Sequence, residues 1–365
     1  MPITAHATSE GTARYRDRYS TLPGHFRRAQ GLWLSSIGLG TYLGQPGAQV
    51  DADYNAAIKR ALTSGLNVID TASNYRFQRS ERAIGTAVTE LIEARSIARD
   101  EIVLCTKGGY IPFDSEYLRD PNRYIRETII DAGLATADDI VDGHCLAPRF
   151  IRAQLEQSLR NLNVSSVDVY YIHNPESQLE SIGRTEFRDR LRRAFIVLEN
   201  AAAEGLIKYY GTATWNGYRV PPGVAQHLSL EDVLSLARDI GGLSHHCRFV
   251  QLPYNLAMLE ALTVRNQRAA DELLSAFEAA ERFDVTVMCS ASLLQGRLLG
   301  QLPDMLRERF EGLTTDAQRC LQFVRSTPGV TTALVGMSRA RHVADNLALT
   351  QVAPLTTEQF KLLFA

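Results

Sequence analysis

The segment Val167-Asp-Val-Tyr-Tyr-Ile172 is a short run rich in β-branched and aromatic residues, and a helix-patterned stretch follows it at about residues 186–204. The same alternation recurs along the chain on both sides. Further strands are expected at 36–39, 67–70, 102–106, 206–213, 249–252, 285–288 and 332–335, and further helices near 53–64, 80–94, 148–162, 230–240 and 266–282. Strands that are apolar on both faces and alternate with helices indicate a parallel sheet covered by helices. Eight such units predict an α/β fold of the closed (β/α)8 TIM-barrel class.

The alternative arrangement is an open, doubly wound sheet that binds a dinucleotide beyond its first strand. Such a sheet would carry a GxGxxG motif there, and Gly38-Leu-Gly-Thr41 does not have that spacing. The sequence shows no repeat of 20–50 residues, so a solenoid is not expected.

Length and composition narrow the functional classes. The 365 residues are 45% hydrophobic and 22% charged, which is typical of a folded globular chain. The net charge of -2 gives no electrostatic reason to expect binding to nucleic acid or to an anionic membrane. No apolar run approaches the roughly 18 residues needed to span a bilayer, and the polar start has no signal-peptide core. Five scattered cysteines without a CxxC pair favour reduced thiols in a cytoplasmic protein.

The extra length falls in a few connections of one domain, 1–365. Residues 1–30 precede the barrel as an extension, expected to form a hairpin over its bottom. Residues 108–148 are a polar insertion after the third strand, and 214–227 and 293–328 are further long connections. Connections that follow barrel strands lie on the catalytic face, so we expect these loops to be lids or to set specificity.

Four polar residues stand at or just beyond expected strand ends: Asp70, Tyr75, Lys107 and His173. In a barrel, all four would point into one mouth. Taken singly, each could be a solvated strand end or a structural hydrogen-bonding group. Together they suit acid catalysis on a carbonyl, because an ammonium group lowers the pKa of a neighbouring phenol and a carboxylate keeps that ammonium charged and in place. A neutral imidazole can orient the substrate oxygen. No side chain supplies hydride, so this chemistry needs a nicotinamide cofactor.

The motifs around these residues resemble those of the aldo-keto reductase family. Asn67-Val-Ile-Asp-Thr-Ala-Ser-Asn-Tyr75 with Ser80-Glu-Arg-Ala-Ile-Gly85 is similar to the family signature, and Leu104-Cys-Thr-Lys-Gly108 and Asp168-Val-Tyr-Tyr-Ile-His-Asn-Pro175 are similar to two further blocks. The resemblance covers about residues 32–350. It implies a (β/α)8 barrel that binds NADP(H) without a Rossmann fold and reduces aldehydes or ketones. It also implies that Tyr75 donates the proton, Lys107 and Asp70 tune it, and His173 orients the carbonyl.

The resemblance also implies the cofactor contacts. The family's Ser-Asn pair for the carboxamide falls on Ala213-Thr214, Gln251 matches the family's glutamine, and Ser290 stands where many relatives stack a Tyr on nicotinamide. Ser338, Arg339 and His342 are candidates for a 2′-phosphate, and Arg339 or Arg341 would compensate for Gly336, which replaces a Lys of many relatives. The full set expected at the cofactor is Gly40, Thr41, Asp70, Asn174, Thr214, Gln251, Ser290, Leu293, Gln295, Arg297, Gly336, Ser338, Arg339, His342, Asp345 and Asn346.

The function expected from these residues is NADP(H)-dependent reduction of a small carbonyl compound, or oxidation of the alcohol. Two alternatives stay open on the same scaffold: a nucleotide-binding barrel that regulates a partner, and a redox-neutral dehydratase or isomerase. A metal site could be drawn from His144, Cys145 and His173, but no ligand spacing supports it and none is expected. The insertion 108–148 is interpreted as a lid over the substrate, with no catalytic role for its Tyr and His residues.

Overall fold

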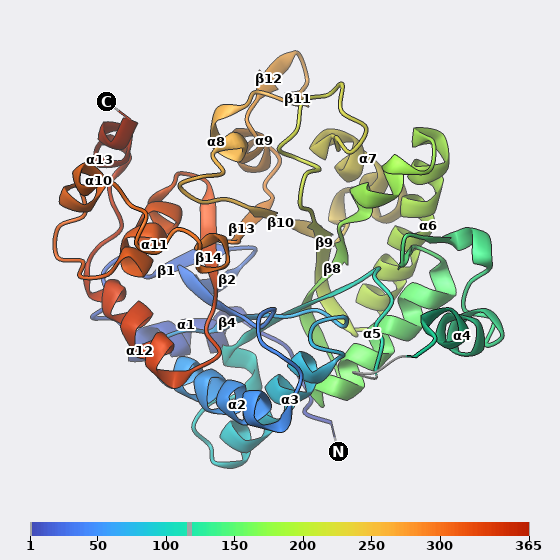
Figure 1. Ribbon diagram of the computed structural model, residues 1–365, viewed down its shortest axis with the longest axis horizontal. Coiled ribbons are helices and arrows are strands. Elements are labelled where there is room, and N and C mark those ends of the chain that lie inside the picture. Colours follow the sequence, from blue (N-terminus) through green and yellow to red (C-terminus); the bar gives the residue numbers. More distant parts are fainter. Residues whose placement is uncertain (1, 115–118, 365) are drawn as a thin grey trace.

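The computed structural model describes residues 2–114 and 119–364, and a closed barrel of eight parallel strands lies at its centre (Figure 1). The strands pair around the barrel in the order β10-β13-β14-β3-β4-β5-β8-β9. Their bounds are β3 Ile37–Gly40, β4 Val68–Asp70, β5 Val103–Gly108, β8 Val167–His173, β9 Ile207–Ala213, β10 Cys247–Pro253, β13 Thr286–Ser290 and β14 Val330–Gly336. The predicted (β/α)8 class is therefore confirmed.

Successive side chains of each strand point alternately into the barrel interior and toward the surrounding helices. Val103 and Cys105 of β5, and Val169 and Tyr171 of β8, belong to one buried cluster inside the barrel. Since side chains alternate between the two faces of a strand, Lys107 continues the inward row of β5. His173 continues the row of β8 in the same way, so both rows end in a polar group at the carboxyl end of the barrel.

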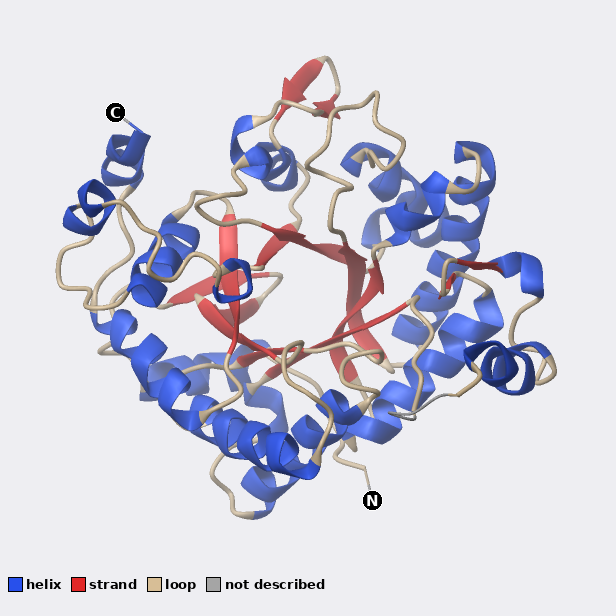
Figure 2. Cartoon of the chain, viewed as in Figure 1, coloured by secondary structure: helices blue, strands red, loops and turns tan. Residues whose placement is uncertain are grey.

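Helices form the outer layer around these strands (Figure 2). The bounds are α2 Ala48–Leu62, α3 Arg79–Glu93, α5 Pro148–Leu162, α6 Arg184–Ala203, α7 Leu230–Gly241, α8 Glu260–Thr263, α9 Ala276–Arg282, α10 Asp304–Glu308, α11 Asp316–Ser326, α12 Ala340–Ala348 and α13 Thr357–Lys361. Short helical turns are η1 Arg99–Glu101, η3 Ala137–Asp139, η4 Pro175–Glu180, η5 Gly242–Ser244, η6 Leu294–Gly296, η7 Leu349–Gln351 and η8 Leu362–Phe364. None of the helices in the described ranges is long and apolar enough to cross a membrane.

The amino-terminal end of the barrel is closed by a helix and a hairpin. Helix α1 (Ser9–Arg18) precedes the antiparallel pair β1 (Phe26–Ala29) and β2 (Leu32–Ser35). Leu32 and Leu34 pack in the same cluster as the inward-facing strand residues. The expected hairpin therefore exists, but it lies at 26–35 instead of within 1–30, and a helix that begins after the Thr8 N-cap occupies much of the extension.

The prediction of a helix at 266–282 is wrong over more than half of that segment. The segment 266–282 begins with the hairpin β11 (Gln267–Ala269) and β12 (Glu272–Leu274), and only α9 is helical. Ala270 takes a left-handed φ of 54° at the turn, which ends any helix there. Ser275 then caps α9 by accepting the N–H of Glu278.

The insertion after β5 contains α4 (Pro121–Ile125), a π-helical turn η2 (Arg126–Ile130), and the pair β6 (Ile140–Val141) and β7 (His144–Cys145). Residues 115–118 of this insertion lie outside the described part. Arg190 of α6 donates to the carbonyl of Asp138 at 2.8 Å, so this part of the insertion is fastened to the outer helical layer.

Candidate active site

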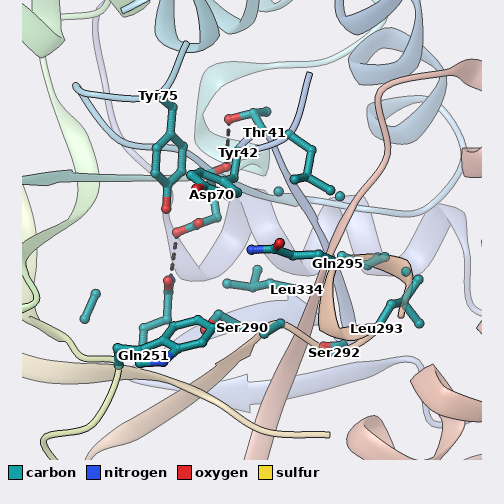
Figure 3. Close-up of a pocket in the computed structure, with 18 of the residues that line it drawn as sticks. Thr41, Tyr42, Asp70, Tyr75, Gln251, Ser290, Ser292, Leu293, Gln295 and Leu334 are labelled. Carbon is teal, nitrogen blue, oxygen red and sulfur yellow. Dashed lines mark hydrogen bonds between the residues drawn. The ribbon is translucent and has the colours of Figure 1, made fainter. Parts of the chain in front are cut away.

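A cavity of about 800 Å³ opens at the carboxyl ends of the barrel strands (Figure 3). It is lined by the ends of seven strands and by the loops that follow them. The predicted residues among its lining are Gly40, Thr41, Asp70, Tyr75, His173, Asn174, Thr214, Gln251, Ser290, Leu293, Gln295, Gly336, His342, Asp345 and Asn346. Four predicted residues are not in the lining: Lys107 is buried beneath it, Arg297 and Arg339 are exposed, and Ser338 directly precedes Arg339.

A buried ammonium group lies at the base of the cavity. Lys107 Nζ donates to Asp70 Oδ2 at 2.6 Å, to the Thr71 carbonyl at 2.8 Å and to the Tyr75 hydroxyl at 3.4 Å. Gln251 Nε2 donates to the other carboxylate oxygen, Asp70 Oδ1, at 2.8 Å (Figure 3). The structure thus gives the Gln251 amide a partner within the protein, whereas the resemblance assigned it to the carboxamide of the cofactor.

The balance of charge and burial sets the protonation of this group. Burial works to lower the pKa of Lys107, but Asp70 and Tyr75 outweigh it and the pKa is raised. Burial raises the pKa of Tyr75, and Lys107 opposes that rise. The lowering of the Tyr75 pKa that is expected from the ammonium group is therefore present, but desolvation exceeds it. At neutral pH, Tyr75 is a phenol beside a charged Lys107, ready to give a proton.

The imidazole of His173 forms the wall beside Tyr75, with ring centroids 5.8 Å apart and planes at 78°. Burial, Lys107 and His144 hold its pKa well below the ordinary value of 6.5, so the ring is neutral at physiological pH. Within the described part of the chain, its buried Nδ1 atom has no hydrogen-bond partner. A neutral ring can donate one hydrogen bond to a carbonyl oxygen without competing with Tyr75 as an acid.

Residues of the insertion 108–148 contact both the backbone and the ring of His173. His144 Nε2 lies 2.7 Å from the His173 carbonyl oxygen, and His144 Nδ1 lies 3.1 Å from the amide nitrogen of Gln178. Because a carbonyl only accepts, the proton of His144 is on Nε2. Tyr110 packs edge-on against both imidazole rings, at 5.0 and 5.1 Å between centroids. Among the described residues of 108–148, Tyr110 is the one that lines the cavity, and the interpretation of this insertion as a lid stays a prediction.

A left-handed turn follows Tyr75. Arg76, Phe77 and Gln78 have φ values of 50°, 58° and 67° in succession. Gln78 Nε2 donates to the Pro112 carbonyl at 2.9 Å, and the buried guanidinium of Arg76 donates to Asp51 at 2.7 Å. These contacts compensate for a backbone that residues with a Cβ rarely adopt.

The cavity wall carries unpaired polar atoms that suit a nicotinamide. Thr214 Oγ1 and Asn74 Oδ1 are buried and have no partner among the residues that the structure describes, whereas buried polar atoms in a native protein are normally paired. The side chains of Ser290 and Gln295 also line the cavity. At the other end of the cavity, burial together with Arg341 and Arg339 lowers the pKa of His342, which places this residue in a cationic setting. The residues present therefore fit a dinucleotide with a carboxamide at one end and phosphate at the other.

The described ranges contain no group of three His, Cys, Asp or Glu side chains arranged to hold a metal ion. The structure places His144 against the His173 carbonyl, where its Nε2 is a donor and not a ligand.

A family model described as the Aldo/keto reductase family matches residues 36–310. The chain belongs to the aldo/keto reductase family. It is 25% identical over 318 residues to D-threo-aldose 1-dehydrogenase from a Pseudomonas species, over 81% of this chain and 82% of that protein. It is also 25% identical to a probable voltage-gated potassium channel subunit beta from Arabidopsis thaliana, over 90% of each.

A crystal structure of an aldo/keto reductase from Klebsiella pneumoniae in complex with NADP and acetate has a TM-score of 0.62 to this chain. The two are 23% identical and cover 93% of this chain and 94% of that one, so this likeness shows the fold alone. The family resemblance drawn from the motifs is confirmed. Reasoning from sequence missed the contact between His144 and His173. It also missed the hydrogen bonds from the backbone N–H groups of 215–217 to Glu176 Oε1, although Glu176 directly follows the motif that ends at Pro175.

Proposed function

We propose that this aldo/keto reductase family member is an NADP(H)-dependent oxidoreductase. It reduces an aldehyde or ketone, or oxidises the corresponding alcohol, with Tyr75 as general acid or base. The observation that carries this proposal is the chain of contacts from Asp70 through Lys107 to the Tyr75 hydroxyl at a cavity wall. The family and the solved NADP complex of a Klebsiella relative support the cofactor.

NADPH, when bound, supplies the hydride. The protein's residues do the rest: the substrate carbonyl oxygen lies between Tyr75 and His173, and His173 orients it through a hydrogen bond. Tyr75 gives its proton to that oxygen as the carbon becomes an alcohol carbon, and Lys107 stabilises the phenolate that remains. Asp70 keeps Lys107 charged and fixed. Thr214 would hold the carboxamide, and Arg339 and His342 would face the adenosine phosphate.

Tyr75→Phe tests the assignment. General acid catalysis typically contributes about 10²–10⁴-fold, so turnover measured by reduced-nicotinamide absorbance should fall by that factor. Cofactor affinity, measured by quenching of protein fluorescence, should stay near that of the unaltered protein. Tyr42→Phe is the matched control, because Tyr42 lines the same cavity and packs edge-on against Tyr75 at 5.0 Å. Full activity in Tyr75→Phe would reject the proposal.

A second candidate is a nucleotide-binding subunit that regulates a partner. The potassium channel subunit beta among its relatives and Ser290 in place of a stacking Tyr favour it. Tight NADPH binding without oxidation across a panel of aldehydes and ketones would select this function. Conversion of a substrate with no net change in nicotinamide absorbance would instead select redox-neutral chemistry.

A further inference from the structure

Trp215 stands next to the proposed catalytic groups through the pairing of two strands. Ala213 of β9 pairs with His173 of β8, and the Asn174 N–H donates to the Ala213 carbonyl at 2.6 Å. Trp215 follows two residues later and lines the cavity. Its side chain is 41% exposed, although it lies in a part of the chain that is otherwise well packed.

A buried carboxylate holds the backbone at Trp215. The N–H groups of Trp215, Asn216 and Gly217 converge on Glu176 Oε1, at 2.6, 3.0 and 3.3 Å. Glu176 is 2% exposed, and it lies in η4, three residues after His173. Three charge-assisted hydrogen bonds offset the cost of burying this carboxylate. They also join the loop at Trp215 to η4, which follows His173 closely in the chain.

The carbonyl side of Trp215 is held as well. Arg219 Nε donates to the Trp215 carbonyl at 2.9 Å, and Arg219 Nη1 donates to Glu260 Oε2 of α8 at 2.9 Å. The backbone of Trp215 is therefore fixed at its N–H and at its C=O while its indole faces the open cavity. An exposed aromatic ring on a fixed backbone is a preformed contact surface, which binds a ligand without first having to be ordered.

Apart from the charged pair Asp70 and Lys107, aromatic side chains pack on Tyr75 and His173. Tyr42 packs edge-on against Tyr75, and Tyr110 against His173. The described lining residues near Tyr75 and His173 include no Lys or Arg, and the Lys107 ammonium beneath them is paired with Asp70. A carboxylate or phosphate on the substrate would therefore find no free cationic partner at this end of the cavity.

We propose that Glu176 is a positioning residue that holds Trp215 as a fixed aromatic wall, and that this wall selects neutral, flat, unsaturated carbonyl substrates such as aryl aldehydes. The substrate part rests on the proposed function, whereas the clamp itself does not. Thr214, which directly precedes Trp215, is held separately, because its N–H donates to the Gln251 carbonyl at 2.8 Å.

Fluorescence tests the clamp without any activity. The chain has two tryptophans, and Trp33→Phe leaves Trp215 as the only one. In that background, Glu176→Ala should shift the emission to the red and raise the acrylamide quenching constant about twofold, whereas Glu176→Gln, which keeps an acceptor oxygen, should restore the original emission. Glu101→Ala is the matched control, because Glu101 is a buried carboxylate that accepts the Ala98 N–H away from the cavity. Unchanged Trp215 emission and quenching in Glu176→Ala would overturn the clamp.

Kinetics test what the wall selects. Glu176→Ala and Trp215→Ala should each raise KM for benzaldehyde about five- to tenfold, the scale of one lost aromatic contact, with kcat within about threefold. KM for propanal should change far less, and 4-formylbenzoate should be a poorer substrate than benzaldehyde. Equal effects on benzaldehyde and propanal would overturn the substrate class. If Glu176→Ala does not fold, Glu176→Asp, which withdraws the carboxylate by one methylene, takes its place in both assays with the same expected directions. If the unaltered protein reduces no carbonyl, the proposed function fails, and fluorescence still decides the clamp.

Discussion

Replacing Lys107 with Met should lower the free energy of unfolding by about 3–5 kcal/mol, the usual cost of removing one partner of a buried ion pair. The side chains of Lys107 and Asp70 are 0% and 6% exposed, and their charged atoms are 2.6 Å apart. Without the ammonium, Asp70 keeps the hydrogen bond from Gln251 but has no opposite charge. The carboxylate must then stay buried without an opposite charge to compensate it.

The double variant Asp70→Asn with Lys107→Met distinguishes the stability lost with the ion pair from the stability lost with side-chain packing. It removes both charges, so it should recover about 2–3 kcal/mol of the loss seen in Lys107→Met. The exposed pair Lys59 and Glu90 is the matched control, since their side chains are 36% and 45% exposed. Lys59→Met should cost less than about 1 kcal/mol.

Urea unfolding followed by far-UV circular dichroism measures these differences by linear extrapolation. The pH dependence gives a second check with a defined sign. The folded pKa of Lys107 is raised above its ordinary 10.5, so its stabilisation is complete below pH 10.5 and is lost only as pH rises through the raised value. The difference between the unaltered protein and Lys107→Met should be constant from pH 6 to 9. Strictly additive effects of the two substitutions, or a Lys107→Met loss under 1 kcal/mol, would refute the reasoning.

Three further outcomes follow from the site. Burial raises the pKa of Tyr75, and the reduction uses its phenol form. The reduction rate, measured by stopped-flow absorbance, should therefore stay level through pH 9 and fall only above about pH 10. In Lys107→Met, the same fall in rate should occur at a still higher pH. In ¹⁵N NMR of its imidazole, His173 should titrate with a midpoint well below 6.5, because burial, Lys107 and His144 lower its pKa, and a midpoint near 6.5 would contradict the site geometry. His144→Ala should lower kcat about tenfold with cofactor affinity unchanged, while His227→Ala, which removes a similar ring-to-carbonyl contact far from the cavity, should leave kcat unchanged.

The barrel could be predicted because its strands are short, apolar on both faces and regularly separated by helices. The segment 148–162 was placed to the residue, since Pro148 begins the helix and Asn163 ends it in a left-handed conformation. The segment 266–282 failed because a two-residue hairpin turn leaves little trace in apolar periodicity. The pattern Ser275-Ala-Phe-Glu278 is a capping box and would have marked the true start of the helix.

The four catalytic candidates could be found because each stands at or just beyond the end of a strand, in a motif that resembles a family block. The residues that form hydrogen bonds with these candidates could not be predicted. The contact of His144 with His173 joins residues 29 apart across an insertion, and the bond from Gln251 to Asp70 joins residues 181 apart. Such contacts depend on how the barrel closes, and local pattern carries no information about them.

Strand register fixes the charged groups and the imidazole of the site, whereas loop contacts fix the aromatic residues around it. Asp70, Lys107 and His173 belong to inward rows of strands whose other residues fill the barrel, so a one-residue slip would turn each of them outward among the helices. The carboxylate, the ammonium group and the imidazole that surround Tyr75 are therefore as fixed as the core itself. Trp215 and Tyr110 lie beyond the strands, and side-chain hydrogen bonds and ring contacts hold them. Substitutions in Glu176 or Arg219 can thus change which carbonyl compound is bound, while Tyr75 and Lys107 keep the geometry that transfers the proton.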